Sequence, residues 1–161
     1  MPRRIEVILE NRGVRAVAEL LDDDAPKTCQ AVWDALPQSG PTFHAKWANN
    51  EVYILTPPFA KEEPGRENAT VFPIPGDILY FFVPPGGHVP PDMREQCGST
   101  GVIDLAIFYG RNNYLHGPDG HMPGNLFAVF TEGLKELAAA CQDLWRNGAG
   151  SERMTFRRLE E

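Results

Sequence analysis

Polar side chains that can bind a ligand gather in the stretch FYGRNNYLHGPDGHMPGN, from Phe108 to Asn125. The aromatic residue Tyr109 is followed by Arg111 and a pair of amides, and Asn125 closes the stretch. Arginine is a rigid two-pronged donor and asparagine both donates and accepts, so the set suits recognition of a carboxylate or an amide. Asparagine also tolerates turn geometry, and a plain surface turn is the alternative interpretation.

A second group of polar side chains lies in TFHAKWANNEVYI, where His44 and Trp47 come shortly before Glu51 and Tyr53. If this stretch folds as a hairpin, the four side chains are within local reach of one another. His44 then either lines a ligand site or is a structural residue whose ring is satisfied by the backbone, and the sequence leaves both readings open.

Metal binding and nucleophilic catalysis have weaker support. The chain has four histidines, His44, His88, His116 and His121, and the last two lie in HGPDGH. None of them shows the HxH or HExxH spacing of a metal site, so we predict no metal site and no cofactor. Cys29 and Cys141 occupy apolar helix positions and are predicted to be buried, whereas Cys97 lies in a loop and is predicted to be accessible. Whether the chain is an enzyme stays open.

The elements that must position these side chains are mostly strands. One predicted hairpin spans RRIEVILENRGVRAVAEL, with Gly13 supplying the positive φ of its turn. A second pairs 42–47 with 51–56 around Asn49 and Asn50, which sets Lys46 opposite Tyr53. Four further apolar runs predict strands, in GDILYFFVP, VIDLAIFYG, NLFAVFT and ERMTFRRLE.

Two helices accompany the strands. Asp24 is the expected N-cap of a helix that begins at Pro26 and ends near Pro37, and an apolar stripe predicts another helix over about 132–146. Long polar loops over 84–101 and 111–124 flank the strand that ends at Tyr109. About eight strands with few helices between them predict a mainly β fold, a closed eight-stranded barrel with two capping helices, in a single domain over 1–161.

Composition and charge exclude some classes of binding partner. The net charge of -7, with no long basic run, argues against nucleic acid. The longest apolar stretch, ILYFFVPP, is too short to span a bilayer, and the first residues lack a signal-peptide core, so no membrane partner is expected. Three scattered cysteines suit a reducing cytoplasm.

The stretch DDDAPKTCQAVWDAL followed by GPTFHA resembles the first helix and the following strand of cyclophilins, and the C-terminal FAVFTEGLKELAAACQDLWRNGAGSERMTFRRLEE is similar to the cyclophilin ending. The resemblance covers roughly half of the chain. It implies an eight-stranded barrel with a helix over each end, and terminal strands that pair side by side, which would bring Arg3 and Arg157 into one neighbourhood.

Prolyl isomerase activity, which the resemblance also implies, depends in cyclophilins on an Arg directly after the FH pair. Ala45 stands there, and a methyl group cannot donate the required hydrogen bond. Lys46 should face away, because neighbouring strand residues point to opposite faces. In its H..W...VYI, PGDILY, YG and PGN.F segments the chain is similar instead to a divergent bacterial group of cyclophilin-like proteins of uncharacterised function.

The sequence therefore predicts a cytoplasmic protein that binds a small polar ligand, anionic or amide, on the barrel face. The predicted pocket is lined by Tyr109 and Arg111, with three further residues within reach: His44, Trp47 and Asn125. The alternatives are a peptidyl-prolyl cis-trans isomerase and a non-catalytic protein-interaction module that uses the Pro-rich loops. Assembly into a homo-oligomer is left open.

Overall fold

The computed structural model describes residues 1–87, 89, 91 and 94–160. Twelve strands are found in this part of the chain: β1 (Arg4–Leu9), β2 (Val14–Leu20), β3 (Gln38–Pro41), β4 (Phe43–His44), β5 (Glu51–Thr56), β6 (Ala69–Thr70), β7 (Asp77–Val83), β8 (Val102–Phe108), β9 (His116–Gly117), β10 (Gly120–His121), β11 (Gly124–Glu132) and β12 (Arg153–Arg158). The helices within the same residues are α1 (Pro26–Ala35), the short α2 (Arg94–Cys97) and α3 (Leu134–Asn147).

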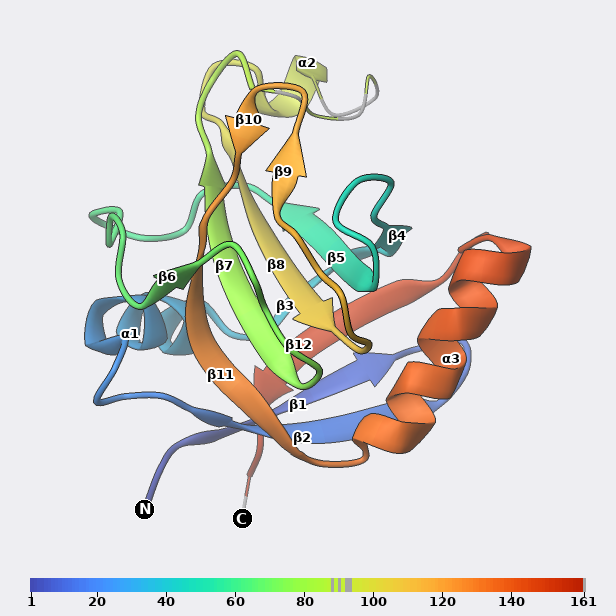
Figure 1. Cartoon of the computed structure of the whole chain (residues 1–161). Coiled ribbons are helices and arrows are strands. Elements are labelled where there is room, and N and C mark those ends of the chain that lie inside the picture. Colours follow the sequence, from blue (N-terminus) through green and yellow to red (C-terminus); the bar gives the residue numbers. More distant parts are fainter. Residues whose placement is uncertain (88, 90, 92–93, 161) are drawn as a thin grey trace.

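One antiparallel sheet makes the body of the molecule (Figure 1). Its strands follow the order β3-β12-β1-β2-β11-β7-β8-β5-β4, and β6 pairs with β11. The sheet curls until β3 lies against β5, where a Cβ placed on Gly40 would be 3.4 Å from Ile54 Cβ. The result is a nearly closed β-barrel, as the sequence predicted.

The barrel interior is apolar, and the two longer helices cover its ends. Alternate residues of each strand point inward, which is why Val52 and Ile54 of β5 and Leu105 and Ile107 of β8 join one buried cluster. Helix α1 adds Val32 to that cluster and helix α3 adds Leu137. Figure 1 places the two helices on opposite sides of the barrel.

The terminal strands pair as expected. β1 lies between β2 and β12, with Glu6 opposite Arg157. Arg3 and Arg158 approach the same indole, with guanidinium carbons 5.1 and 4.6 Å from the Trp33 ring centre, so the arginines from the two ends do share one neighbourhood. Cys29 and Cys141 are buried, also as predicted, whereas the Cys97 side chain and His88 lie outside what the structure describes.

The expected N-cap of α1 was wrong. Ala25 occupies the cap position and makes no side-chain capping bond. The carboxylate of Glu67, about forty residues away in the sequence, accepts instead from the backbone N–H of Lys27 at 3.2 Å and of Thr28 at 2.8 Å. An acid that is remote in sequence thus bonds the free N–H groups of the first helical turn, and no local sequence pattern predicts this contact.

The register of the second hairpin was also wrong. Phe43 pairs with Tyr53 and His44 with Val52, so β4 is short and 45–50 forms a wide loop. The loop is anchored elsewhere, because Asn50 Nδ2 donates to the Arg111 carbonyl at 2.7 Å and its backbone N–H to Asn113 Oδ1 at 3.0 Å. These bonds to the turn after β8 replace the expected two-residue turn.

Candidate functional site

The structure brings together two of the predicted site residues, His44 and Tyr109. The Tyr109 hydroxyl donates to His44 Nε2 at 2.5 Å, and His44 Nδ1 donates to the Ala45 carbonyl at 3.0 Å. Burial lowers the pKa of His44 and raises the pKa of Tyr109 to about 12, so both groups are neutral at pH 7. With both ring nitrogens satisfied, this pair has the character of a structural contact at the barrel end.

Arg111 lies in an exposed turn after β8. Its neighbour Asn112 takes a φ of 65°, and Asn113 is 5% exposed with Nδ2 donating to the carbonyls of Pro73 and Gly110. The asparagines therefore build the turn, as in the alternative interpretation of this stretch, while the Arg111 side chain extends from its surface.

Asn125 belongs to a different part of the molecule. Its Nδ2 donates to Gly65 O at 2.7 Å and to Thr28 Oγ1 at 3.1 Å, and its Oδ1 accepts from Glu67 N–H at 3.0 Å. The side chain clamps the segment after β5 against α1. It does not join His44, Tyr109 or Arg111 in one site.

Trp47 is 54% exposed and meets His116 edge to face, with ring centres 5.6 Å apart. Tyr114 stacks on His116 at 4.7 Å and its hydroxyl bonds His121. β9 and β10 place the two histidines opposite each other. No group of three metal-ligating side chains occurs among the residues that the structure describes.

The outer face of β5 and β8 carries an acidic pair that the sequence interpretation missed. Glu51 and Tyr53 point outward from β5, and Asp104 points outward from the neighbouring β8. The register sets Asp104 opposite Leu55 and Glu51 opposite Phe108, so Tyr53 lies between the two acids along the sheet. Glu51 is only 6% exposed. Asp104 Oδ1 is buried and finds no hydrogen-bond donor within the described part of the chain, although the residue as a whole keeps a partly exposed edge.

Electrostatics single out the same three side chains. Burial raises the pKa of Glu51 to about 8. Burial, and secondarily the charge of Glu51, raises the pKa of Asp104 well above its usual value. The pKa of Tyr53 is raised as well, by burial and then by the charges of Asp104 and Glu51. Buried acids without a cationic partner among the described residues are candidates for a functional site.

The surroundings of the acids are apolar and include small side chains. Ala45 and Ala106 lie in the same outward-facing cluster as Tyr53 and Phe108, and Leu115 from the loop after β8 packs onto it. The Ala45 N–H donates to the Glu51 carbonyl at 2.9 Å.

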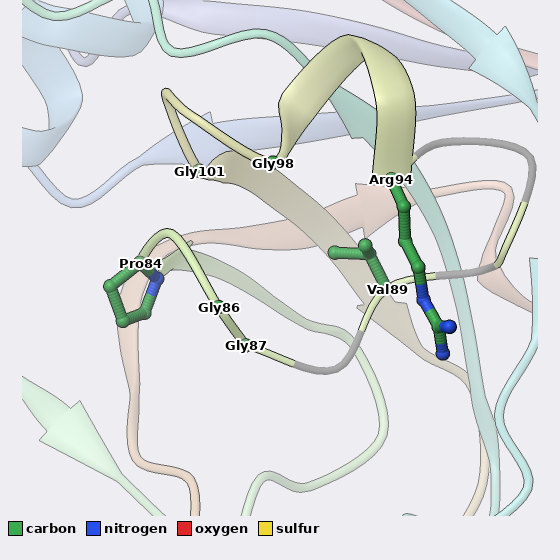
Figure 2. Close-up of a pocket in the computed structure, with 7 residues that line it drawn as sticks. All are labelled: Pro84, Gly86, Gly87, Val89, Arg94, Gly98 and Gly101. Atoms are coloured by element: carbon green, nitrogen blue, oxygen red, sulfur yellow. The ribbon is translucent and has the colours of Figure 1, made fainter.

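A cavity of about 330 Å³ lies beyond one end of this face, in the loop between β7 and β8. Figure 2 shows the Arg94 side chain extending from α2 past Val89. Val89 packs against a cluster that includes Tyr53 and Leu55. The loop therefore connects the cavity with the acidic face through apolar contacts.

Comparison with protein families gives one match. The profile of the family described as "Protein of unknown function (DUF3830)" matches residues 7–156. The chain belongs to this family. A search of curated proteins finds no match.

Among solved structures, the chain is similar to "Structure of McbB in complex with tryptophan", with a TM-score of 0.63 and 18% identity over 98% of this chain. It spans 45% of that protein, less than half of its length. A solution structure of the hypothetical protein AF2241 from Archaeoglobus fulgidus matches with a TM-score of 0.52 and 20% identity, over 98% of this chain and 95% of that one. Both likenesses concern the fold alone.

A sequence signal for the acidic pair existed. Asp104 interrupts the apolar run VIDLAIF, and an acid at an outward position of a strand whose neighbours are all buried is unusual. The sequence also pointed to Glu51 and Tyr53, but the strand pairing that sets them on the same face as Asp104 was not foreseeable. No helix among the described residues has the length and apolar character needed to cross a bilayer.

Proposed function

We propose that this protein binds a small ligand carrying an ammonium or amide N–H group at the outer face of β5 and β8. Asp104 accepts a hydrogen bond from that group, and Glu51 lies farther along the same face, beyond Tyr53. The observation that carries the proposal is Asp104 Oδ1, a buried acceptor with no donor in the described chain. A buried polar atom without a partner is costly, and a ligand donor would remove that cost.

The acidic pair favours an amide or amine over an anion. An anionic ligand would meet two carboxyl groups at this face and would force both to stay protonated. An ammonium group would instead favour their ionised forms and form charge-assisted hydrogen bonds. The partly exposed side chains of Ala45 and Tyr53 give the apolar part of the ligand a surface to pack on.

Prolyl isomerase activity has less support than ligand binding. Ala45 lies on the same face as the acids, at the position where the cyclophilin resemblance implies the catalytic arginine. Its methyl group offers no donor to a proline nitrogen. A protease-coupled assay with a proline peptide should show no acceleration beyond the uncatalysed rate, whereas a cyclophilin-like rate would reverse this proposal.

Three indole compounds test the proposed recognition, chosen because one structural neighbour was solved with tryptophan. Tryptamine has an amine alone, tryptophan has an amine and a carboxylate, and indole-3-propionate has a carboxylate alone. Titration calorimetry should rank their affinities in that order. Equal binding of tryptamine and indole-3-propionate, or binding of neither, would contradict the proposal.

Variants locate the binding site. Asp104→Asn should weaken tryptamine binding by about 1.5 to 3 kcal/mol, the usual value of a hydrogen bond to a charged group. Glu136→Gln on α3 is the matched control, because this exposed acid lies away from the face and should leave the affinity unchanged. An equal loss in both variants would mean that only net charge attracts the amine.

A further inference from the structure

A groove on another part of the barrel has the opposite electrostatic character. It has a volume of about 670 Å³ and is lined by side chains from β1, β2 and β12 and by the segments that follow α1 and β12. Three arginines line it, Arg15, Arg157 and Arg158, against two acids, Glu6 and Glu160. A local excess of positive charge is notable in a chain whose net charge is -7.

Two of the arginines share a single carboxylate. Glu6 of β1 is 4% exposed, and strand pairing sets it opposite Arg157 of β12 on one side and Val17 of β2 on the other. Arg157 Nε donates to Glu6 Oε2 at 2.6 Å, and Arg15 Nη2 forms an ion pair with Glu6 Oε1. One negative charge thus orients two guanidinium groups, and each has further N–H donors to offer.

Arg158 is held by a different partner. Its Nε and Nη2 donate to the Trp33 carbonyl at 3.1 and 2.7 Å, and its guanidinium carbon lies 4.6 Å from the centre of the Trp33 ring. The side chain is exposed yet fixed by two hydrogen bonds and a cation–π contact. Fixed guanidinium groups bind an anion with little loss of side-chain entropy.

We propose that this groove binds the phosphate group of a small phosphomonoester, whose apolar part packs on Leu36 and Pro37. A phosphate carries nearly two negative charges and three terminal oxygens, which match several guanidinium donors better than a single carboxylate does. Leu36 and Pro37 line the groove beside the arginines and supply the apolar wall. The groove is separate from the acidic face of β5 and β8, so this inference is independent of the function proposed above.

The test is a calorimetric titration of the full chain with phenyl phosphate, inorganic phosphate and benzoate. Phenyl phosphate should bind most tightly, inorganic phosphate several-fold more weakly because it lacks the apolar part, and benzoate most weakly. Arg157→Gln and Arg15→Gln should each lower the affinity for phenyl phosphate by about tenfold or more, as expected for a lost charge-assisted bond. Arg146→Gln, an exposed arginine of α3, is the control and should leave it unchanged.

One further variant should strengthen binding instead of weakening it. Glu6→Gln removes the carboxylate that competes with the phosphate, so it should tighten binding of phenyl phosphate if the variant folds. Trp33 fluorescence gives a site-specific readout once the exposed Trp47 and Trp145 are replaced by Phe, because Trp33 contacts Arg158 directly. No binding of phenyl phosphate, no response of Trp33, or equal weakening by Arg157→Gln and Arg146→Gln would overturn the proposal.

Discussion

Two buried acids on this barrel have almost the same exposure and opposite electrostatics. Glu152 is 2% exposed and Glu51 is 6% exposed. Burial opposes ionisation of Glu152, but bonds from the backbone N–H groups of Asn11 and Arg153 and from Arg12 outweigh it and lower the pKa of Glu152. At Glu51 burial acts alone and raises the pKa to about 8. Glu152 therefore stabilises the fold in its ionised form, whereas ionised Glu51 destabilises it. A buried acid of the second kind is a candidate for ligand binding.

Glu152→Gln should have the largest effect of the variants that probe this comparison. The change removes the ion pair with Arg12 and replaces one acceptor oxygen by an amide that cannot accept from the same backbone N–H groups. We expect a loss of about 3 to 5 kcal/mol in the free energy of unfolding, typical of a broken buried pair. Urea denaturation at pH 7 measures it, and a loss below 1 kcal/mol would contradict the assigned role.

The pH dependence of Glu152 follows from the sign of its shift. Because its folded-state pKa is lowered, its contribution is present above the unfolded pKa and is lost as the pH falls through the folded pKa. The difference in stability between the wild type and Glu152→Gln should therefore shrink below about pH 4, since glutamate in unfolded chains titrates near that value.

Glu51→Gln should change stability in the opposite direction. The folded-state pKa of Glu51 is raised, so the folded chain holds a proton that the unfolded chain has released, and stability falls as the pH rises from the unfolded pKa to about 8. Gln has no such proton, and the variant should equal or exceed the wild type by on the order of 2 kcal/mol at pH 8, with a smaller gain at pH 5. Thermal unfolding at both pH values tests this, and a variant that is less stable at pH 8 would show that Glu51 has a hidden partner.

The contrast between these acids could not be read from the sequence. Arg12 and Glu152 lie 140 residues apart, and only the pairing of β1 with β12 brings them together. The pairing of β5 with β8 likewise brings Asp104 and Glu51 onto one face of the sheet, on either side of Tyr53. Eight of the strands, both long helices and the terminal pairing followed from local periodicity and from the resemblance of the two chain ends, whereas the short strands β3, β6, β9 and β10 were not predicted.

The errors in the predicted site have a shared physical cause. Tyr109 was expected to face the pocket with Arg111. Instead, Tyr109 continues the inward-facing series of β8 that includes Leu105 and Ile107, and the chain turns before Arg111. Asn125 was assigned to a ligand although three tertiary hydrogen bonds use its amide. Side-chain type indicates what a residue can bind, whereas its partner is decided by long-range contacts.

Tyr109→Phe should have a smaller effect than either acid variant. The change leaves His44 Nε2 without the hydroxyl donor that it now has at 2.5 Å, at a cost of about 1 to 2 kcal/mol in unfolding free energy. Chemical denaturation gives the size of the loss. Nitrogen NMR of His44 should show a neutral ring protonated on Nδ1 in the wild type, and a charged ring at pH 7 would contradict the assigned contact.

Trp47→Ala should have the smallest effect on stability. Trp47 is half exposed and meets the His116 ring edge to face, with ring centres 5.6 Å apart, so we expect a loss of about 0.5 to 1 kcal/mol in unfolding free energy. Thermal unfolding measures it. A loss above 2 kcal/mol would mean that Trp47 anchors the 45–50 loop more firmly than Asn50 does.

The acidic pair itself can be observed by carbon NMR of the side-chain carboxyls of Glu51 and Asp104 during a pH titration, with and without tryptamine. Without the amine, Glu51 should titrate with an apparent pKa near 8, and the pKa of Asp104 should lie well above the usual value of an aspartate. With saturating tryptamine, the apparent pKa values should fall, because a bound ammonium favours the ionised carboxylates. Carboxyls that titrate near pH 4 and do not respond to tryptamine would contradict the claim that this face is a binding site.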